Sequence, residues 1–120
     1  MNFEENGSIT VIAGEDRMMI LRIVDKLTQE PFDLTAASAI NARFKNADQT
    51  VLIKNLTAGV SIVSAPAGKI SVSLSATETA LLNVRENQSF EVEFVIGTGA
   101  VAKLTVVQFI EALTVRGRVV

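Results

Sequence analysis

Apolar and polar residues alternate with a period of two along several short stretches of the chain. The alternation is clearest in residues 39–45, 69–74 and 90–96. Because successive side chains of a strand point to opposite faces, this pattern predicts strands with one buried and one solvent-exposed face, as in antiparallel sheets. Turn-forming Gly, Pro, Asn and Asp residues separate the apolar stretches. Turns at intervals of about 8–12 residues are typical of a β-sandwich or barrel.

Two longer stretches are apolar on both faces and break this pattern. They are residues 17–24 and 104–113. A loop or helix that covers the second face would explain them, as would a β-bulge at Val106-Val107 or Phe109-Ile110. The other explanation is that these faces pack against a partner molecule.

One segment favours a helix. Ser75 and Glu78 have the spacing of a capping box, in which the serine hydroxyl accepts from the amide three residues later and the glutamate reaches back. The good helix formers that follow predict a helix of about two turns over residues 76–82, with its two leucines facing the core. Asn83 is expected to end this helix in the left-handed conformation.

The composition indicates a single all-β domain over residues 1–120. Hydrophobic residues make up 48% of the chain and aromatic residues only 5%, so Ile, Val and Leu dominate the apolar content. The β-branched residues among them favour extended backbone. No repeat or linker interrupts the sequence. We therefore predict one antiparallel, Ig-like β-sandwich of about seven or eight strands with one short helix, flanked by terminal arms at residues 1–7 and 116–120.

The charge of the chain argues against nucleic acid and membrane partners. The net charge is −2, and there is no basic cluster of the kind that neutralises phosphates. Arg116 and Arg118 are interpreted as a solvated or interface-packed end of the chain. No apolar run approaches the roughly 20 residues of a membrane-spanning helix. Residues 1–6 also lack the basic and apolar regions of a signal peptide.

Catalytic chemistry has little support in the sequence. His and Cys are both absent, which removes the commonest general base, the best metal ligand and the thiol nucleophile. Glu91 and Glu93 share one face of a predicted strand, as the two carboxylates of a glycosidase would, but we interpret them as the solvent-exposed half of an alternating strand. We predict a protein that is not an enzyme and that uses no cofactor, no metal and no small-molecule substrate.

The order of several short motifs resembles a known family. A Gly-Glu-Asp turn at residues 14–16 precedes a hydrophobic strand, and Pro-Phe-Asp-Leu-Thr at residues 31–35 leads to the next strand. Gly-Lys-Ile-Ser-Val-Ser-Leu-Ser at residues 68–75 and Thr-Glu-Thr-Ala-Leu-Leu at residues 77–82 follow. This order, over residues 8–115, resembles the N-terminal domain family of phage baseplate upper proteins and related small Ig-like domains of tailed-phage virions.

The resemblance implies a structural virion protein of a tailed phage, assembled in the cytoplasm of the bacterial host. Its place would be the tail, baseplate, neck or fibre-attachment region, with other virion proteins and further copies of the chain as partners. The sequence departs from the family at residues 86–90, where a Gly-Arg/Lys-Tyr start is usual. One alternative is a capsid decoration protein. A carbohydrate-binding or adhesive module is a more distant alternative, because Trp and Tyr, which stack on sugar rings, are absent.

Seven residues are candidates for a protein interface, because they lie on the two-sided strands or near the chain ends. They are Met18, Ile20, Phe109, Ile110, Phe3, Arg116 and Arg118.

Overall fold

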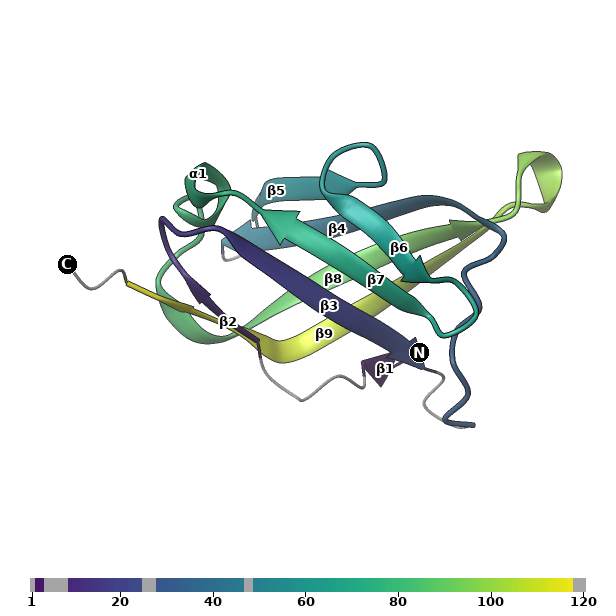
Figure 1. Ribbon diagram of the computed structural model, residues 1–120, viewed down its shortest axis with the longest axis horizontal. Helices are drawn as coiled ribbons and strands as arrows, with labels where there is room; N and C mark the ends of the chain where they lie inside the picture. The colour runs from purple at the N-terminus through teal and green to yellow at the C-terminus, as the bar shows by residue number, and fades with distance from the viewer. Residues whose placement is uncertain (1, 4–8, 25–27, 47–48, 118–120) are drawn as a thin grey trace.

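The computed structural model describes residues 2–3, 9–24, 28–46 and 49–117, and it arranges them in two packed β-sheets (Figure 1). The strands are β1 (Asn2–Phe3), β2 (Ile9–Ile12), β3 (Arg17–Val24), β4 (Ala37–Asn46), β5 (Gln49–Asn55), β6 (Val60–Ser64), β7 (Lys69–Leu74), β8 (Arg85–Ile96) and β9 (Lys103–Arg116). The helical segments are α1 (Ala76–Thr79) and a single 3-10 turn, η1 (Gly99–Val101).

The strand order is that of an immunoglobulin-like sandwich. One sheet has the order β1-β3-β7-β6 and the other β2-β9-β8-β4-β5. These orders correspond to strands A-B-E-D and, from β9 onward, G-F-C-C′ of the immunoglobulin fold. The predicted all-β, Ig-like sandwich with one short helix is confirmed. Two details differ: β2 pairs with β9 in parallel, and β1 lies inside the predicted arm of residues 1–7, where it pairs with β3.

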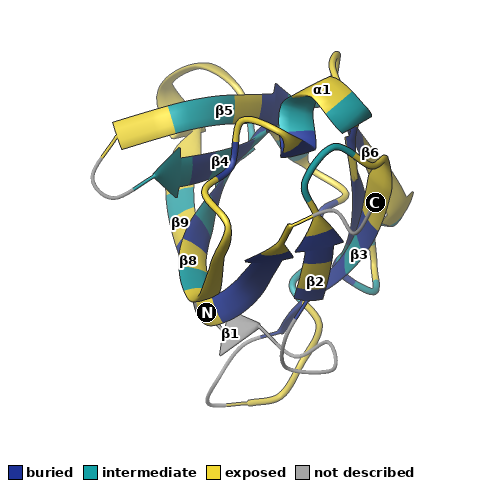
Figure 2. Ribbon diagram, turned by 90° about the vertical axis from the view of Figure 1, so that its left-hand side faces the viewer, coloured by how far each residue is buried: buried dark blue, intermediate teal, exposed yellow. Residues whose placement is uncertain are grey.

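The core lies between the two sheets, and buried residues alternate with exposed ones along the strands that enclose it (Figure 2). A row of three phenylalanines crosses the larger sheet. Phe90 lies opposite Phe44 on β4 and Phe109 on β9, with ring centroids 5.1 and 4.6 Å apart, respectively. Such aromatic pairs stabilise a core beyond the area they bury. The sequence has no Cys and no Trp, so the core has neither an inter-sheet disulfide nor a buried tryptophan.

Helix α1 is a single turn, shorter than the predicted span of residues 76–82. Its capping box is confirmed, because the Glu78 amide donates to Ser75 Oγ and the Ser75 amide donates to Glu78 Oε1. Asp16 adds a second cap by accepting from the Ala76 amide at 2.7 Å. The buried Thr79 hydroxyl accepts from the amide of Gly14 and donates to the carbonyl of Glu15. The β2–β3 turn is therefore fastened to the helix.

The two leucines after α1 differ in their burial. Leu82 is buried as predicted, whereas Leu81 is 51% exposed. The prediction of a left-handed Asn83 is wrong: the non-glycine residues with positive φ in the described segments are Gln29, Asn87 and Glu111.

A β-bulge explains the C-terminal part of the two-sided apolar pattern of β9. Glu111 has a φ of 55°, and its amide donates to Ser89 Oγ. Val107 and Phe109 face the core before this point, and residues 112–115 are all buried after it. The irregularity lies between Phe109 and Leu113, next to the predicted pair Phe109-Ile110, and no register shift falls at the other predicted pair, Val106-Val107. On β3, the outer side of Val24 is covered where it bridges to Pro31 in the following loop.

The motif at residues 31–35 shapes the loop that crosses from β3 to β4. The Thr35 hydroxyl and amide both donate to Asp33 Oδ1, at 2.6 and 2.9 Å, and these bonds hold the pKa of Asp33 below its ordinary value. Leu34 is buried beside them. Gly68 lies against this loop, and a Cβ there would come within 2.6 Å of the Ile23 carbonyl oxygen and 2.8 Å of the Phe32 carbonyl oxygen. The motif and its glycine therefore have a structural role.

Candidate functional site

A ladder of charged side chains crosses the outer face of the five-stranded sheet. Arg43 and Lys45 project from β4, and Glu91 and Glu93 project from β8. Arg43 lies opposite Glu91 in the register but bonds Glu93 at 3.4 Å, and Lys45 pairs with Glu91 at 3.6 Å. These side chains are 19–37% exposed, so each pair contributes little to stability. The ion pairs hold these charged side chains in place, so the outer face of the sheet is polar along β4 and β8.

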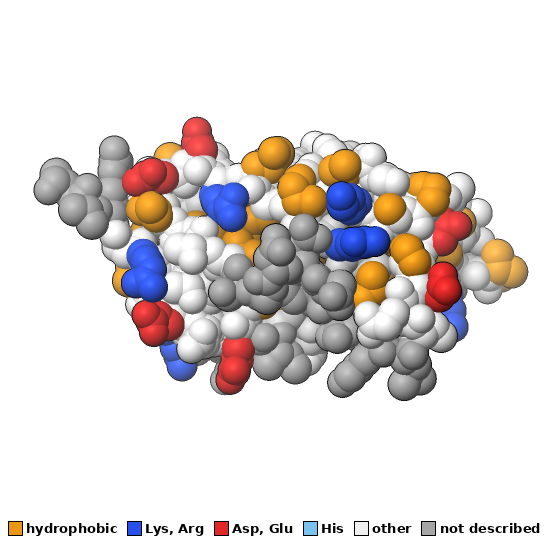
Figure 3. Space-filling view, turned by 60° about the horizontal axis from the view of Figure 1, so that its bottom comes forward, with side chains coloured by type: hydrophobic (Ala, Val, Ile, Leu, Met, Phe, Trp, Pro, Cys, Tyr) orange, Lys and Arg blue, Asp and Glu red, His pale blue; other side chains and the backbone are white. Residues whose placement is uncertain are grey.

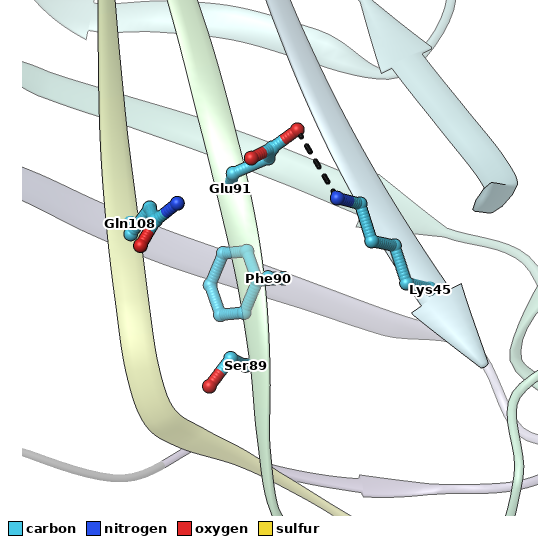
Figure 4. A pocket seen from close by; sticks show the side chains of 5 residues that line it. All are labelled: Lys45, Ser89, Phe90, Glu91 and Gln108. Atoms are coloured by element: carbon cyan, nitrogen blue, oxygen red, sulfur yellow. Dashed lines mark ion pairs between the residues drawn. The ribbon is translucent and has the colours of Figure 1, made fainter. Parts of the chain in front are cut away.

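A shallow hollow of about 130 Å³ lies at one end of this ladder. Figure 4 shows its lining, with Lys45 on β4, Ser89, Phe90 and Glu91 on β8 and Gln108 on β9. One water molecule occupies about 30 Å³ of liquid, whereas pockets for small organic ligands usually measure roughly 300–1,000 Å³. The hollow is a groove between side chains and is too small for an organic substrate.

Apolar side chains flank the ladder along β9 and at the hairpin that joins β8 to β9. Val101 is 84% exposed at the hairpin, Leu104 is 58% exposed and Val106 is 45% exposed. We call these three residues the β9 strip. The hairpin extends beyond the rest of the sandwich (Figure 1). The first residue of the strip, Val101, therefore lies on a projecting part of the molecule. On the other side of the ladder, Ile53 of β5 is 49% exposed.

The outer face of the four-stranded sheet has a different character. Met18 and Ile20 on β3 lie opposite Ser73 and Ser71 on β7, and the basic Arg22 and Lys69 follow in the same register. Figure 3 shows the side of the molecule that lies at the bottom of Figure 1, where hydrophobic side chains are scattered and Lys and Arg side chains lie among them. In the four-stranded sheet, serines lie within the β3–β7 pairing and the positive charge lies at one end of it. The exposed large apolar residues of this sheet, among those described, are Met18, Ile62 and Val63.

The structure separates the residues predicted for the interface. Met18 and Ile20 share one outer face, where Met18 is 56% exposed and Ile20 is half-buried. The prediction for Phe109 is corrected: it is fully buried in the phenylalanine row, because the bulge at Glu111 turns the strand only after Phe109 has faced inward.

The remaining predicted residues lie near the chain ends or outside the residues that the structure describes. Arg116 ends β9 and forms an exposed ion pair with Glu86 at 3.6 Å. Arg118 and the side chains of Phe3 and Ile110 lie outside the described residues. The β9 strip was not predicted, although Leu104 and Val106 belong to a stretch whose two-sided pattern suggested a partner.

A partly buried ion pair joins β5 to α1 and was also not predicted. Lys54 Nζ donates to Glu78 Oε2 at 2.6 Å, and the two side chains are 11% and 24% exposed. The bond from Lys54, followed by the one from the Ser75 amide, holds the pKa of Glu78 below its ordinary value. Lys54 crosses over Gly59, where a Cβ would overlap its Cε atom. The pair connects the edge of one sheet to the segment that follows the other.

The described side chains form no recognisable catalytic or metal-binding arrangement. Glu91 and Glu93 are both held in ion pairs on an open face. Among the described residues, no group of three or more His, Cys, Asp or Glu is placed to hold a metal ion. No helix in the same residues has the length and apolar content needed to cross a membrane.

Comparisons with known proteins add a distant structural likeness. No family model and no curated protein matches the sequence. Among solved structures, the chain is similar to murine CRIg with a TM-score of 0.47 and 11% sequence identity, over 98% of each chain. The description of this chain as an Ig-like sandwich rests on its own strand order.

Proposed function

We propose that this chain is a structural protein of a tailed-phage virion, in the tail, baseplate, neck or fibre-attachment region, and that it acts by binding neighbouring virion proteins and further copies of itself. The observation that carries protein binding is the β9 strip, whose three large apolar side chains are 84%, 58% and 45% exposed. The order of motifs over residues 8–115 supports the phage context.

The arrangement of the five-stranded sheet suits a protein partner. An apolar strip beside a fixed set of charges resembles the apolar centre and polar rim of protein interfaces. Covering Val101, Leu104 and Val106 would remove apolar surface from water, which favours association by about 25 cal/mol for each Å². The adjacent ion-pair ladder would then favour partners with complementary charges.

The composition of purified phage particles tests this proposal. In particles of the phage whose genome encodes the chain, we expect mass spectrometry to find it in a fixed number of copies. After dissociation of the particles, it should separate with the tails. Absence from purified particles would overturn the proposal, and recovery with capsid shells would replace the tail role with that of a decoration protein.

A variant of the β9 strip tests the surface itself. The triple variant V101E, L104E and V106E changes exposed side chains, so it should fold but fail to enter particles when it complements a deletion of the gene. The matched control is V84E, because Val84 is 62% exposed in the connection between α1 and β8, at the end of the sandwich away from the hairpin (Figure 1). Equal incorporation of both variants would show that the strip is not the binding surface.

A further inference from the structure

The four strands that end the two sheets differ in length. β1 has 2 residues, β2 has 4, β6 has 5 and β5 has 7. Among the described strands, β5 pairs only with β4. An edge strand presents backbone N–H and C=O groups that another strand can pair with. The edge of β5 is therefore the longest site for strand addition in the described sandwich.

The side chains of β5 give this edge little protection. Natural edge strands are usually guarded by charged side chains, proline, bulges or a covering segment. The sequence of β5, Gln-Thr-Val-Leu-Ile-Lys-Asn, has one charged residue and no proline. That residue, Lys54, is only 11% exposed and is bound to Glu78. A register shift opposite Phe44 and Lys45 interrupts the strand, and Asn55 at its end bridges to Gly59 in the following turn.

We propose that β5 pairs in an antiparallel manner with β5 of a second copy of this chain, so that the two five-stranded sheets join into one. This inference rests on the proposed protein-binding function, and it places the self-association of the chain at the β5 edge. A two-fold axis perpendicular to the joined sheet runs between the two strands, midway between one residue and the copy of that residue on the partner strand, as in other isologous contacts. The sequence of β5 identifies that residue.

The register centred on Leu52 pairs apolar residues with apolar residues. It sets Leu52 opposite its own copy and Val51 opposite Ile53, while Lys54 faces an uncharged Thr50. Apolar and β-branched cross-strand pairs stabilise a sheet, and like charges placed opposite each other destabilise it. A register centred on Val51 would set Ile53 opposite Gln49, and one centred on Ile53 would set Leu52 opposite Lys54. Leu52 is thus the central residue.

Single cysteines test this register directly, because the chain has none of its own. In the variant L52C, the two introduced thiols would face each other across the axis. Opposed residues of antiparallel strands have Cα atoms about 4.5–5.5 Å apart, which lies within the range that a disulfide spans. We expect mild oxidation to convert L52C to a disulfide-linked dimer. The matched control I62C, on the β6 edge, should remain mostly monomeric. Equal cross-linking of the two variants would overturn the proposal.

A mixing experiment checks the register without relying on the partly buried Leu52. V51C and I53C should each cross-link slowly alone, but they should form a mixed disulfide when combined, because the proposed register sets these positions opposite each other. The register would be contradicted if the mixed disulfide formed no faster than the disulfides of V51C alone or I53C alone.

A charge on the edge tests the association itself. Ile53 is 49% exposed, so I53K should fold normally and should raise the dimer dissociation constant at least tenfold in sedimentation velocity. The control I62K, at a residue 37% exposed on β6, should associate like the wild-type chain. A wild-type chain that stays monomeric, or that forms large aggregates without a discrete dimer, would overturn the proposal. The β9-strip variants are assayed by their incorporation into particles. The test of the proposed function and the test of β5 pairing can therefore fail independently of each other.

Discussion

The two sheets share one core but differ on the sides that face solvent. The four-stranded sheet ends in strands of 2 and 5 residues, and its outer face has serines beside Met18 and Ile20. The five-stranded sheet has the 7-residue edge β5, the projecting hairpin, the charge ladder and the β9 strip. Strand length and exposure, and not apolar composition alone, therefore make the five-stranded sheet the candidate for binding partners.

The largest expected effect concerns the phenylalanine row, which belongs to the five-stranded sheet. Phe90 is buried between Phe44 and Phe109, so F90A should lower the free energy of unfolding by about 3–5 kcal/mol through lost burial and a cavity. On the aliphatic inner face of the four-stranded sheet, I70V should cost only about 0.5–1.5 kcal/mol. Urea unfolding measures the loss of free energy in each variant. Similar losses for the two variants would show that the phenylalanine row contributes no more to stability than the aliphatic inner face.

The next effect concerns the connection between the sheets. K54M keeps the length of the side chain but removes the charge-assisted bond to Glu78, which leaves that carboxylate partly buried without its cation. We expect a loss of roughly 1–3 kcal/mol, the usual range for hydrogen bonds to charged groups. The control E86Q alters the exposed pair with Arg116 and should change stability by less than about 0.5 kcal/mol. If K54M unfolds at the wild-type urea concentration, the pair does not stabilise the fold.

The same pair gives a pH dependence. The pKa of Glu78 is lowered from an ordinary value of 4.5, so the unfolded chain takes up this proton at a higher pH than the folded one. The stability from this group is fully present above about pH 4.5 and is lost as the pH falls through the lower folded pKa. Unfolding free energies measured between pH 6 and pH 3 should therefore fall less steeply for E78Q than for the wild-type chain. A slope for E78Q equal to that of the wild-type chain would contradict this assignment.

The smallest effect is expected on the outer face of the four-stranded sheet. Met18 is 56% exposed and lies beside Ser73, so M18K should change the free energy of unfolding by less than about 0.5 kcal/mol. A loss of more than about 1 kcal/mol in urea unfolding would show that this face is packed more closely than its exposure indicates.

Much of the fold follows from local patterns in the sequence. Residues 69–74 alternate, and they form β7 with the same bounds. The capping box at Ser75 and Glu78 also forms as predicted. These features depend on side chains close together in the chain, so their spacing is visible without a structure.

The features that the sequence did not reveal depend on pairing between distant segments. Glu111 adopts a positive φ because Ser89 captures its amide across the sheet, and a glutamate gives no local sign of this conformation. For the same reason, the inward position of Phe109 was missed. Asn87, one of the turn-forming residue types, lies instead at an irregularity inside β8, with a φ of 54°. The candidate edge β5 could be recognised only once the strand order was known.

Pairing of two chains through β5 is tested by the solution mass of the wild type, I53K and M18K, measured by light scattering across a wide concentration range. We expect the wild-type mass to rise with concentration from one chain to two and to stop there. M18K should follow the same curve, whereas I53K should remain at the mass of one chain. Dissociation of M18K with retention of the I53K dimer would place the contact on the four-stranded sheet and contradict pairing through β5.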